Sequence, residues 1–182
     1  MGNNDITLLS VQKIHKPNIE EVIPELLNGD MQKSALRFVA YLRENKMKPA
    51  WTLHNAWKAV YKGKPFYYIR LGWGFGKERV NNNINEKWEV TPYLNHITEY
   101  EETIINEGWQ NIIWDNLRRC KACVYGCSPG IDKIILGKEL KGLCGGFLGG
   151  RFPVMVENPD EARINIIKKL LELEKNTRKE KR

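Results

Sequence analysis

The segment from residue 56 to residue 71 constrains the fold most strongly, because it alternates like a strand, turns at a glycine and then alternates again. Trp57, Ala59 and Tyr61 occupy every second position before Gly63, and the run FYYIRL follows the turn. Period-two alternation on both sides of a short glycine turn is typical of a β-hairpin. We therefore predict a hairpin over residues 56–71, with Gly63 in its turn at a positive or permissive backbone angle.

Helical patterns flank this hairpin on both sides. Apolar residues recur at helical spacing from Met31 to Leu42 before it, and from Ile164 to Leu171 near the end of the chain. The helix and strand patterns come in groups and do not alternate as they would in a parallel α/β protein. We therefore predict the α+β class, with an antiparallel sheet built around the 56–71 hairpin and covered on one side by helices.

Length and composition favour one domain. With 182 residues, 42% of them apolar, the sequence can fill a single well-packed core. We expect one domain over residues 1–174 and a basic tail over residues 175–182. The tail holds five basic side chains and one acidic side chain, which accounts for four of the seven net positive charges. Because the excess charge lies in the tail, nucleic acid is not expected as a partner.

The hydrophobic segments of this chain are short. No apolar run approaches the ~20 residues that a membrane-spanning helix needs, and the first residues lack the apolar core of a signal peptide. We therefore expect a cytoplasmic protein without membrane contact. In a reducing cytosol, clustered cysteines indicate metal binding or thiol chemistry rather than disulfides.

All the cysteines lie in one short window, in the order Cys120, Cys123, Cys127 and Cys144. Four thiolates are the donor set of a tetrahedral structural zinc site, and C-x-x-C spacing lets the first two reach one ion. The other spacings depart from the paired pattern of zinc ribbons, so three interpretations stay open. The cysteines bind a structural zinc ion, they pack as ordinary buried thiols, or Cys120 and Cys123 do redox work beside basic neighbours.

Aromatic side chains crowd into residues 51–93, on strands that keep one face open after helices cover the other. An aromatic face suits a flat or cationic small molecule, through stacking and cation–π contact. The alternative is an aromatic core together with a homodimer interface. The candidate ligand-binding residues are Trp57, Tyr61, Tyr68, Trp73 and Trp88.

Three runs of the sequence carry a resemblance to known proteins: ALRFVAYLRENKMKP, WKAVYKGKPFYYIRL and CKACVYGCSPGIDKIILGKEL. They resemble uncharacterised proteins of anaerobic Firmicutes over roughly residues 35–174, and this resemblance implies no activity. The order of elements is also similar to that of the frataxin-related YdhG-like α+β domains. The second resemblance implies metal handling, although frataxin-like proteins hold iron on an acidic ridge and this chain is basic.

Three functions follow as hypotheses. The first is binding or sensing of a small molecule on the aromatic sheet face, with zinc as a structural clip. The second is frataxin-like metal handling, and the third is a zinc-stabilised nucleic-acid-binding module. No pair of histidine and carboxylate residues has a recognisable catalytic spacing, so the sequence does not indicate an enzyme.

Overall fold

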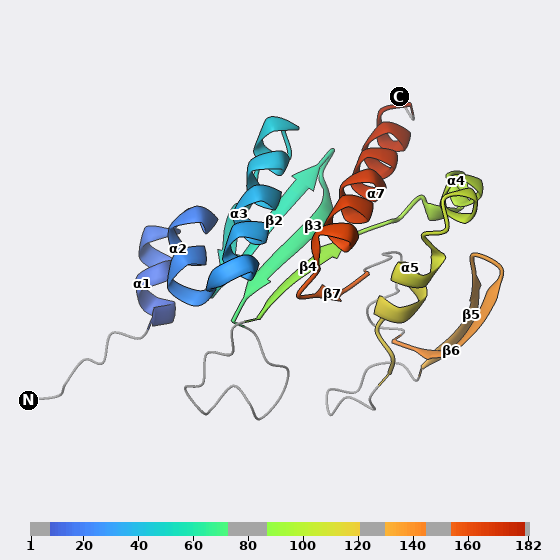
Figure 1. The fold of residues 1–182 in the computed structure, drawn as a ribbon, viewed down its shortest axis with the longest axis horizontal. Coiled ribbons are helices and arrows are strands. Elements are labelled where there is room, and N and C mark those ends of the chain that lie inside the picture. The colour runs from blue at the N-terminus through green and yellow to red at the C-terminus, as the bar shows by residue number, and fades with distance from the viewer. Residues whose placement is uncertain (1–7, 73–86, 121–129, 145–153, 181–182) are drawn as a thin grey trace, which may run out of the picture. The chain divides into compact units, whose positions relative to one another are not determined.

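The computed structural model describes residues 8–72, 87–120, 130–144 and 154–180, and it has the predicted α+β class (Figure 1). Among the described residues, helices come first, a group of strands follows, and further helices and strands lead to a long last helix. The elements are α1 Leu8–His15, α2 Ile19–Leu26, α3 Gly29–Glu44, β1 Ala50–Leu53, β2 Ala56–Tyr61, β3 Lys64–Leu71, β4 Trp88–Pro92, the 3₁₀ helix η2 Ile97–Glu99, α4 Glu101–Asn106, α5 Gln110–Asn116, β5 Ile131–Ile135, β6 Lys138–Leu143, β7 Val156–Glu157 and α7 Glu161–Glu180.

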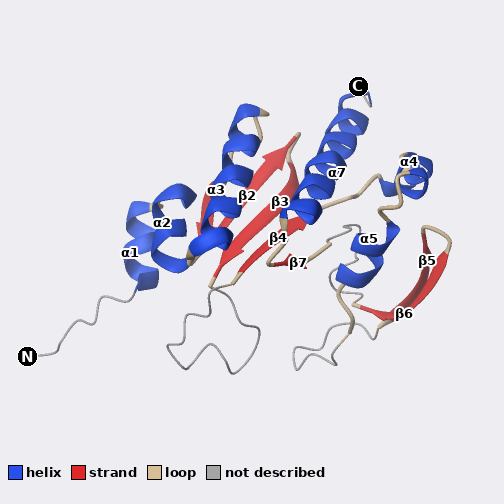
Figure 2. Cartoon of the chain, viewed as in Figure 1, coloured by secondary structure: helices blue, strands red, loops and turns tan. Residues whose placement is uncertain are grey.

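The strands form two sheets. One is an antiparallel sheet with the order β1-β2-β3-β4-β7, and the other is the two-stranded sheet β5-β6 (Figure 2). The chain divides into two compact units, residues 1–89 and residues 90–182, and β4 runs through the boundary. Residues 175–180 of the predicted tail belong to α7. Within the described part of the chain, no helix is long and apolar enough to cross a membrane.

The predicted hairpin is confirmed as β2 and β3. Trp57 pairs with Ile69 across the two strands, and Ala59 pairs with Tyr67. The turn consists of Lys62 and Gly63, whose φ angles are 49° and 74°. Two successive positive φ values define the tight hairpin turn whose twist matches that of the strands. A bulge between Ala59 and Val60 shifts the register by one residue, so turn and bulge together determine which residues pair.

Helices of the first unit cover one face of this hairpin, as predicted. The Trp57 indole N–H donates to the carbonyl of Pro17, between α1 and α2, at 2.9 Å. The Tyr67 hydroxyl donates to the carbonyl of Met47, just after α3, at 2.5 Å. Opposite residues of an antiparallel pair share a face, so both hydrogen bonds tie the Trp57 face to the helical layer.

The core of the first unit lies between α3 and the sheet. The ring of Phe38 on α3 packs against Trp88 of β4, with 6.2 Å between ring centroids. Burying a side chain of this size contributes about 1.5–3 kcal/mol. The predicted apolar stripe of α3 is confirmed, because its buried residues are Ala35, Phe38, Val39 and Leu42.

The second unit is organised around α7. The predicted apolar face of this helix is buried, with Ile167 and Leu171 fully inaccessible to solvent. Trp114 of α5 donates its indole N–H to the carbonyl of Ile135 at 2.8 Å, which ties α5 to the β5–β6 hairpin. In this hairpin β5 pairs with β6, and Ile135 opposes Lys138 across the turn.

The turn of the β2–β3 hairpin can be tested by replacing Gly63. Gly63→Ala should lower the free energy of unfolding by about 1–2 kcal/mol, because a side chain at positive φ crowds its own backbone. An added Cβ would meet nothing within 4 Å, so the loss would be conformational. Gly63→Asn should lose less, since asparagine tolerates this conformation. Urea unfolding measures the difference, and equal stability of wild type and Gly63→Ala would contradict the turn.

Candidate functional site

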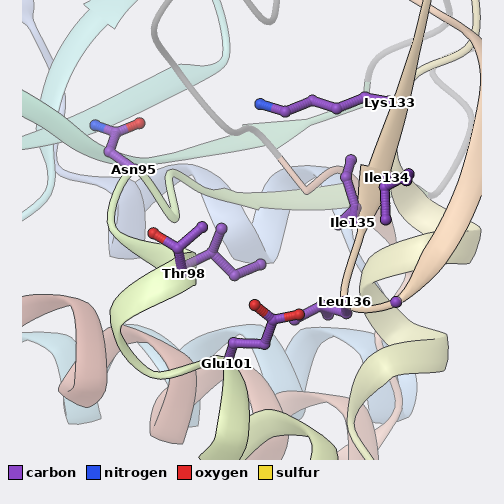
Figure 3. Close-up of a pocket in the computed structure, with 9 residues that line it drawn as sticks. Asn95, Thr98, Glu101, Lys133, Ile134, Ile135 and Leu136 are labelled. Atoms are coloured by element: carbon purple, nitrogen blue, oxygen red, sulfur yellow. The ribbon is translucent and has the colours of Figure 1, made fainter.

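A pocket of about 250 Å³ lies in the second unit, where the segment around η2 approaches the β5–β6 hairpin (Figure 3). Polar groups and apolar side chains both line it, a combination typical of small-molecule sites. Lys133 lies across the pocket from Glu101, while Thr98 is on the same wall as Glu101 (Figure 3). The lining residues are Asn95, Ile97, Thr98, Glu101, Lys133, Ile134, Ile135, Leu136 and Gly137.

The wall that carries Thr98 and Glu101 differs from what their spacing suggests. Thr98-x-x-Glu101 matches a helix capping box and predicts a helix start at Thr98. In the structure Thr98 lies in η2, and α4 begins at Glu101 with Tyr100 at the N-cap. The capping-box prediction is wrong, because the chain makes a 3₁₀ turn before the helix begins. The Glu101 carboxylate points into the pocket instead (Figure 3).

Glu101 is the charge on this wall that is available to a ligand. Its side chain is half-buried, and among the described residues it makes no hydrogen bond or ion pair. Lys133 on the opposite wall already engages in another interaction. A partly desolvated carboxylate without a partner attracts a cationic group more strongly than one in open water.

The apolar wall comes from the end of β5 and the turn after it. Ile135 and Leu136 are buried, whereas Ile134 is 71% exposed. Leu136 has a φ angle of 51°, in the left-handed region that a bulky residue enters at a loss of about 1–2 kcal/mol. The burial of its side chain in the second unit offsets this strain. Leu136 and Gly137, with φ angles of 51° and 76°, are the two turn residues of the β5–β6 hairpin, and a tight turn of this kind requires positive φ at both positions.

Behind the polar wall, Glu174 of α7 is fully buried and accepts hydrogen bonds on both carboxylate oxygens. Oε1 accepts from the Arg178 guanidinium at 2.7 Å and contacts the His96 Nδ1 at 2.9 Å. Oε2 accepts from the Tyr100 hydroxyl at 2.8 Å and from the His96 backbone N–H at 3.1 Å. The predicted basic tail thus includes Arg178, which the structure places in a buried ion pair of α7.

The titration of this cluster follows from its contacts. Burial acts to raise the pKa of the Glu174 carboxyl, but hydrogen bonds from His96, Tyr100 and Arg178 together outweigh burial and hold that pKa below its ordinary value. Burial, and then the neighbouring Glu174 charge, raise the pKa of Tyr100 far above its ordinary value. Glu174 is therefore ionised and Tyr100 is a neutral donor near neutral pH.

The predicted aromatic ligand-binding residues differ in their burial, and two of them belong to the core. Trp57 and Trp88 are core residues with 0% and 1% exposure, so their faces are covered by protein. Tyr61 and Tyr68 are half-buried, with Arg70 lying 5.7 Å from the Tyr68 ring centroid. Trp73 lies outside the described residues. Trp88 is covered by the ring of Phe38 from α3, as part of the core of the first unit.

Two of the predicted zinc ligands lie in the described residues, Cys120 half-exposed and Cys144 buried, both as free thiols. The Cys120 N–H donates to the Gly142 carbonyl at 2.7 Å, and the Cys144 N–H donates to the Arg118 carbonyl at 2.9 Å. In such an antiparallel ladder the two cysteines are diagonal neighbours on one face, about 7–8 Å apart.

The rest of the predicted zinc site is not described. Cys123 and Cys127 lie outside the described residues. Within residues 8–72, 87–120, 130–144 and 154–180, no three His, Cys, Asp or Glu side chains gather into a metal-binding group. Zinc therefore stays a prediction.

The pH dependence of stability should report the buried carboxylate. An unfolded glutamate titrates near ~4.3, and Glu174 in the folded protein has a lower pKa. Its stabilisation is thus complete above that unfolded value and is lost as pH falls through the folded one. The difference in melting temperature between wild type and Glu174→Gln should shrink as pH falls from about 5.5 to about 3. A difference that grows on acidification would contradict this assignment, and the exposed Glu172→Gln serves as control.

Sequence reasoning missed Glu174, although a signal was present. Glu174 and Arg178 continue the buried face of Ile167 and Leu171 at spacings of three and four, so they are polar residues on an apolar stripe. Such residues are buried only with partners. The pocket itself had no signal, because its walls come from segments more than 30 residues apart. No family model, curated protein or solved structure was found to match this chain.

Proposed function

We propose that this protein is a small-molecule-binding module and that its ligand occupies the pocket between the η2 segment and β5. The observation that carries the proposal is the half-buried Glu101 carboxylate, which points into a pocket whose other wall carries Ile135 and Leu136 beside Lys133 (Figure 3). A ligand suited to both walls has a cationic amine for Glu101 and a short apolar part for Ile135 and Leu136.

The size of the pocket limits the ligand. Pockets for drug-sized molecules usually occupy roughly 300–1,000 Å³, and this one is about 250 Å³. The ligand is therefore a small amine or the amine head of a larger molecule. The hydroxyl of Thr98 and the amide of Asn95 add neutral hydrogen-bonding groups to the pocket lining.

A probe with an ammonium group and a short alkyl chain tests this proposal. We expect n-butylammonium to bind with about millimolar affinity, since a ligand of this size gains about 4 kcal/mol. Amide NMR signals of residues 95–101 and 133–137 should shift on titration of the full chain. Butyrate and n-butanol, which share the alkyl chain, should shift them less because they lack the positive charge.

Substitution of the carboxylate provides the matched control. Glu101→Gln keeps the shape of the side chain and should weaken n-butylammonium binding at least fivefold, because the charge is removed. Glu102→Gln changes the exposed next residue of α4 and should leave the affinity within twofold. Equal weakening by both substitutions would assign the effect to net charge and overturn the role of Glu101.

We also propose that the cysteines hold a structural zinc ion. Cys120 and Cys144 share one face of a ladder, and an added Cβ at Gly130 would lie 3.0 Å from the Cβ of Cys120. Cys123 and Cys127 lie outside the described residues, and they enter the proposed ligand set through the sequence, where they stand three residues after Cys120 and three residues before Gly130. Frataxin-like metal handling and nucleic-acid binding stay hypotheses without a supporting contact in the described residues.

Zinc binding has a direct test. The purified protein should contain one equivalent of zinc, and a chelator should release it and lower the melting temperature. Cys144→Ser should remove the metal, whereas Cys144→Ala and Cys144→Ser should differ little if the residue only packs. Four freely titrating thiols in the native, metal-free protein would rule out the zinc site.

A further inference from the structure

We infer that Glu174 is a positioning residue for the pocket: a buried carboxylate on α7 holds the wall that presents Glu101 and Thr98. This inference rests on the proposed function, because it assigns what keeps that binding site in shape. Glu174 does not line the pocket itself. In the wall it contacts His96 and Tyr100, which are the sequence neighbours of the lining residues.

The hydrogen bonds of Glu174 bracket the wall. His96 donates its backbone N–H to Oε2 at 3.1 Å, and its ring Nδ1 lies 2.9 Å from Oε1. Tyr100 donates its hydroxyl to Oε2 at 2.8 Å. Ile97 and Thr98 line the pocket between these two anchored residues, and Glu101 follows the second. One carboxylate therefore fixes both ends of the segment.

The segment that forms this wall, from η2 to the start of α4, has few stabilising interactions of its own. The 3₁₀ helix η2 has three residues, and neither η2 nor α4 has a side-chain hydrogen bond at its N-cap. Short 3₁₀ helices have poor hydrogen-bond geometry, so their position is set by tertiary contacts. Burial of Ile97 and Tyr100 contributes, but apolar contacts are not directional. The hydrogen bonds to Glu174 specify which way the segment faces.

A carboxylate suits this position better than an amide would. Both oxygens of Glu174 accept, and they meet donors from His96, Tyr100 and Arg178. A glutamine of the same shape keeps one acceptor oxygen and turns an NH₂ group toward donors. At least one buried donor then loses its partner, which is strongly unfavourable in a site closed to water. Glu174→Gln is thus a nearly isosteric change that should release the wall.

The experiment compares three variants of the full chain at a temperature where each is folded. Glu174→Gln removes the anchor, and Tyr100→Phe removes only one of its hydrogen bonds. Leu170→Ala is the control, because it destabilises the same helix through a buried apolar residue and removes no hydrogen bond to the wall. Amide hydrogen exchange of residues 95–101 and the affinity for n-butylammonium are measured for each variant.

We expect exchange across residues 95–101 to become at least tenfold faster in Glu174→Gln than in Leu170→Ala, with Tyr100→Phe between them. Affinity for n-butylammonium should fall at least fivefold in Glu174→Gln and stay within twofold of wild type in Leu170→Ala. Exchange in Glu174→Gln and Tyr100→Phe no faster than in Leu170→Ala would overturn the inference. If wild type does not bind n-butylammonium, the proposed ligand fails while the exchange rates still decide the role of Glu174.

Discussion

The register of the β2–β3 hairpin is the constraint on which the first unit depends. Trp57 opposes Ile69 and Ala59 opposes Tyr67, so one face carries the large side chains that meet the helical layer. A slip of one residue would turn Trp57 and Tyr67 to the other face and break their hydrogen bonds to Pro17 and Met47. The Lys62–Gly63 turn and the bulge between Ala59 and Val60 together set this register, because the positive φ angles suit a two-residue loop and the bulge shifts the pairing by one residue.

The second unit uses a buried charge where the first unit uses apolar packing. Glu174 is inaccessible to solvent, and its desolvation is unfavourable unless donors surround it. Arg178 supplies the counter-charge from one turn later in α7, and His96 and Tyr100 supply donors from the wall. Because hydrogen bonds are directional, this cluster fixes orientation as well as position. Such a cluster is suited to holding a short segment that has few bonds of its own.

Near the cysteines, the backbone of residue 130 lies close to Cys120 and Gly142 because residue 130 is a glycine. The backbone of Gly130 lies so near Cys120 and Gly142 that a side chain would leave only 3.0–3.2 Å to the nearest atoms. Cys120 and Cys144 flank the Arg119–Leu143 pair of the same ladder. Glycine thus lets three stretches of chain meet at the place where the two described thiols share a face. That geometry agrees with a metal site and equally with ordinary packing of free thiols.

Local sequence determined the elements that depend on neighbouring residues. Alternation and a glycine turn identified β2 and β3, and apolar spacing identified the buried faces of α3 and α7. Tertiary structure decided the rest, because burial and convergence depend on segments far apart in the chain. It placed Trp57 and Trp88 in the core, turned Glu101 from a presumed cap into a pocket carboxylate, and brought Glu174 to His96 across 78 residues. A pattern within one segment cannot encode such contacts, since the partner side chain lies on another element.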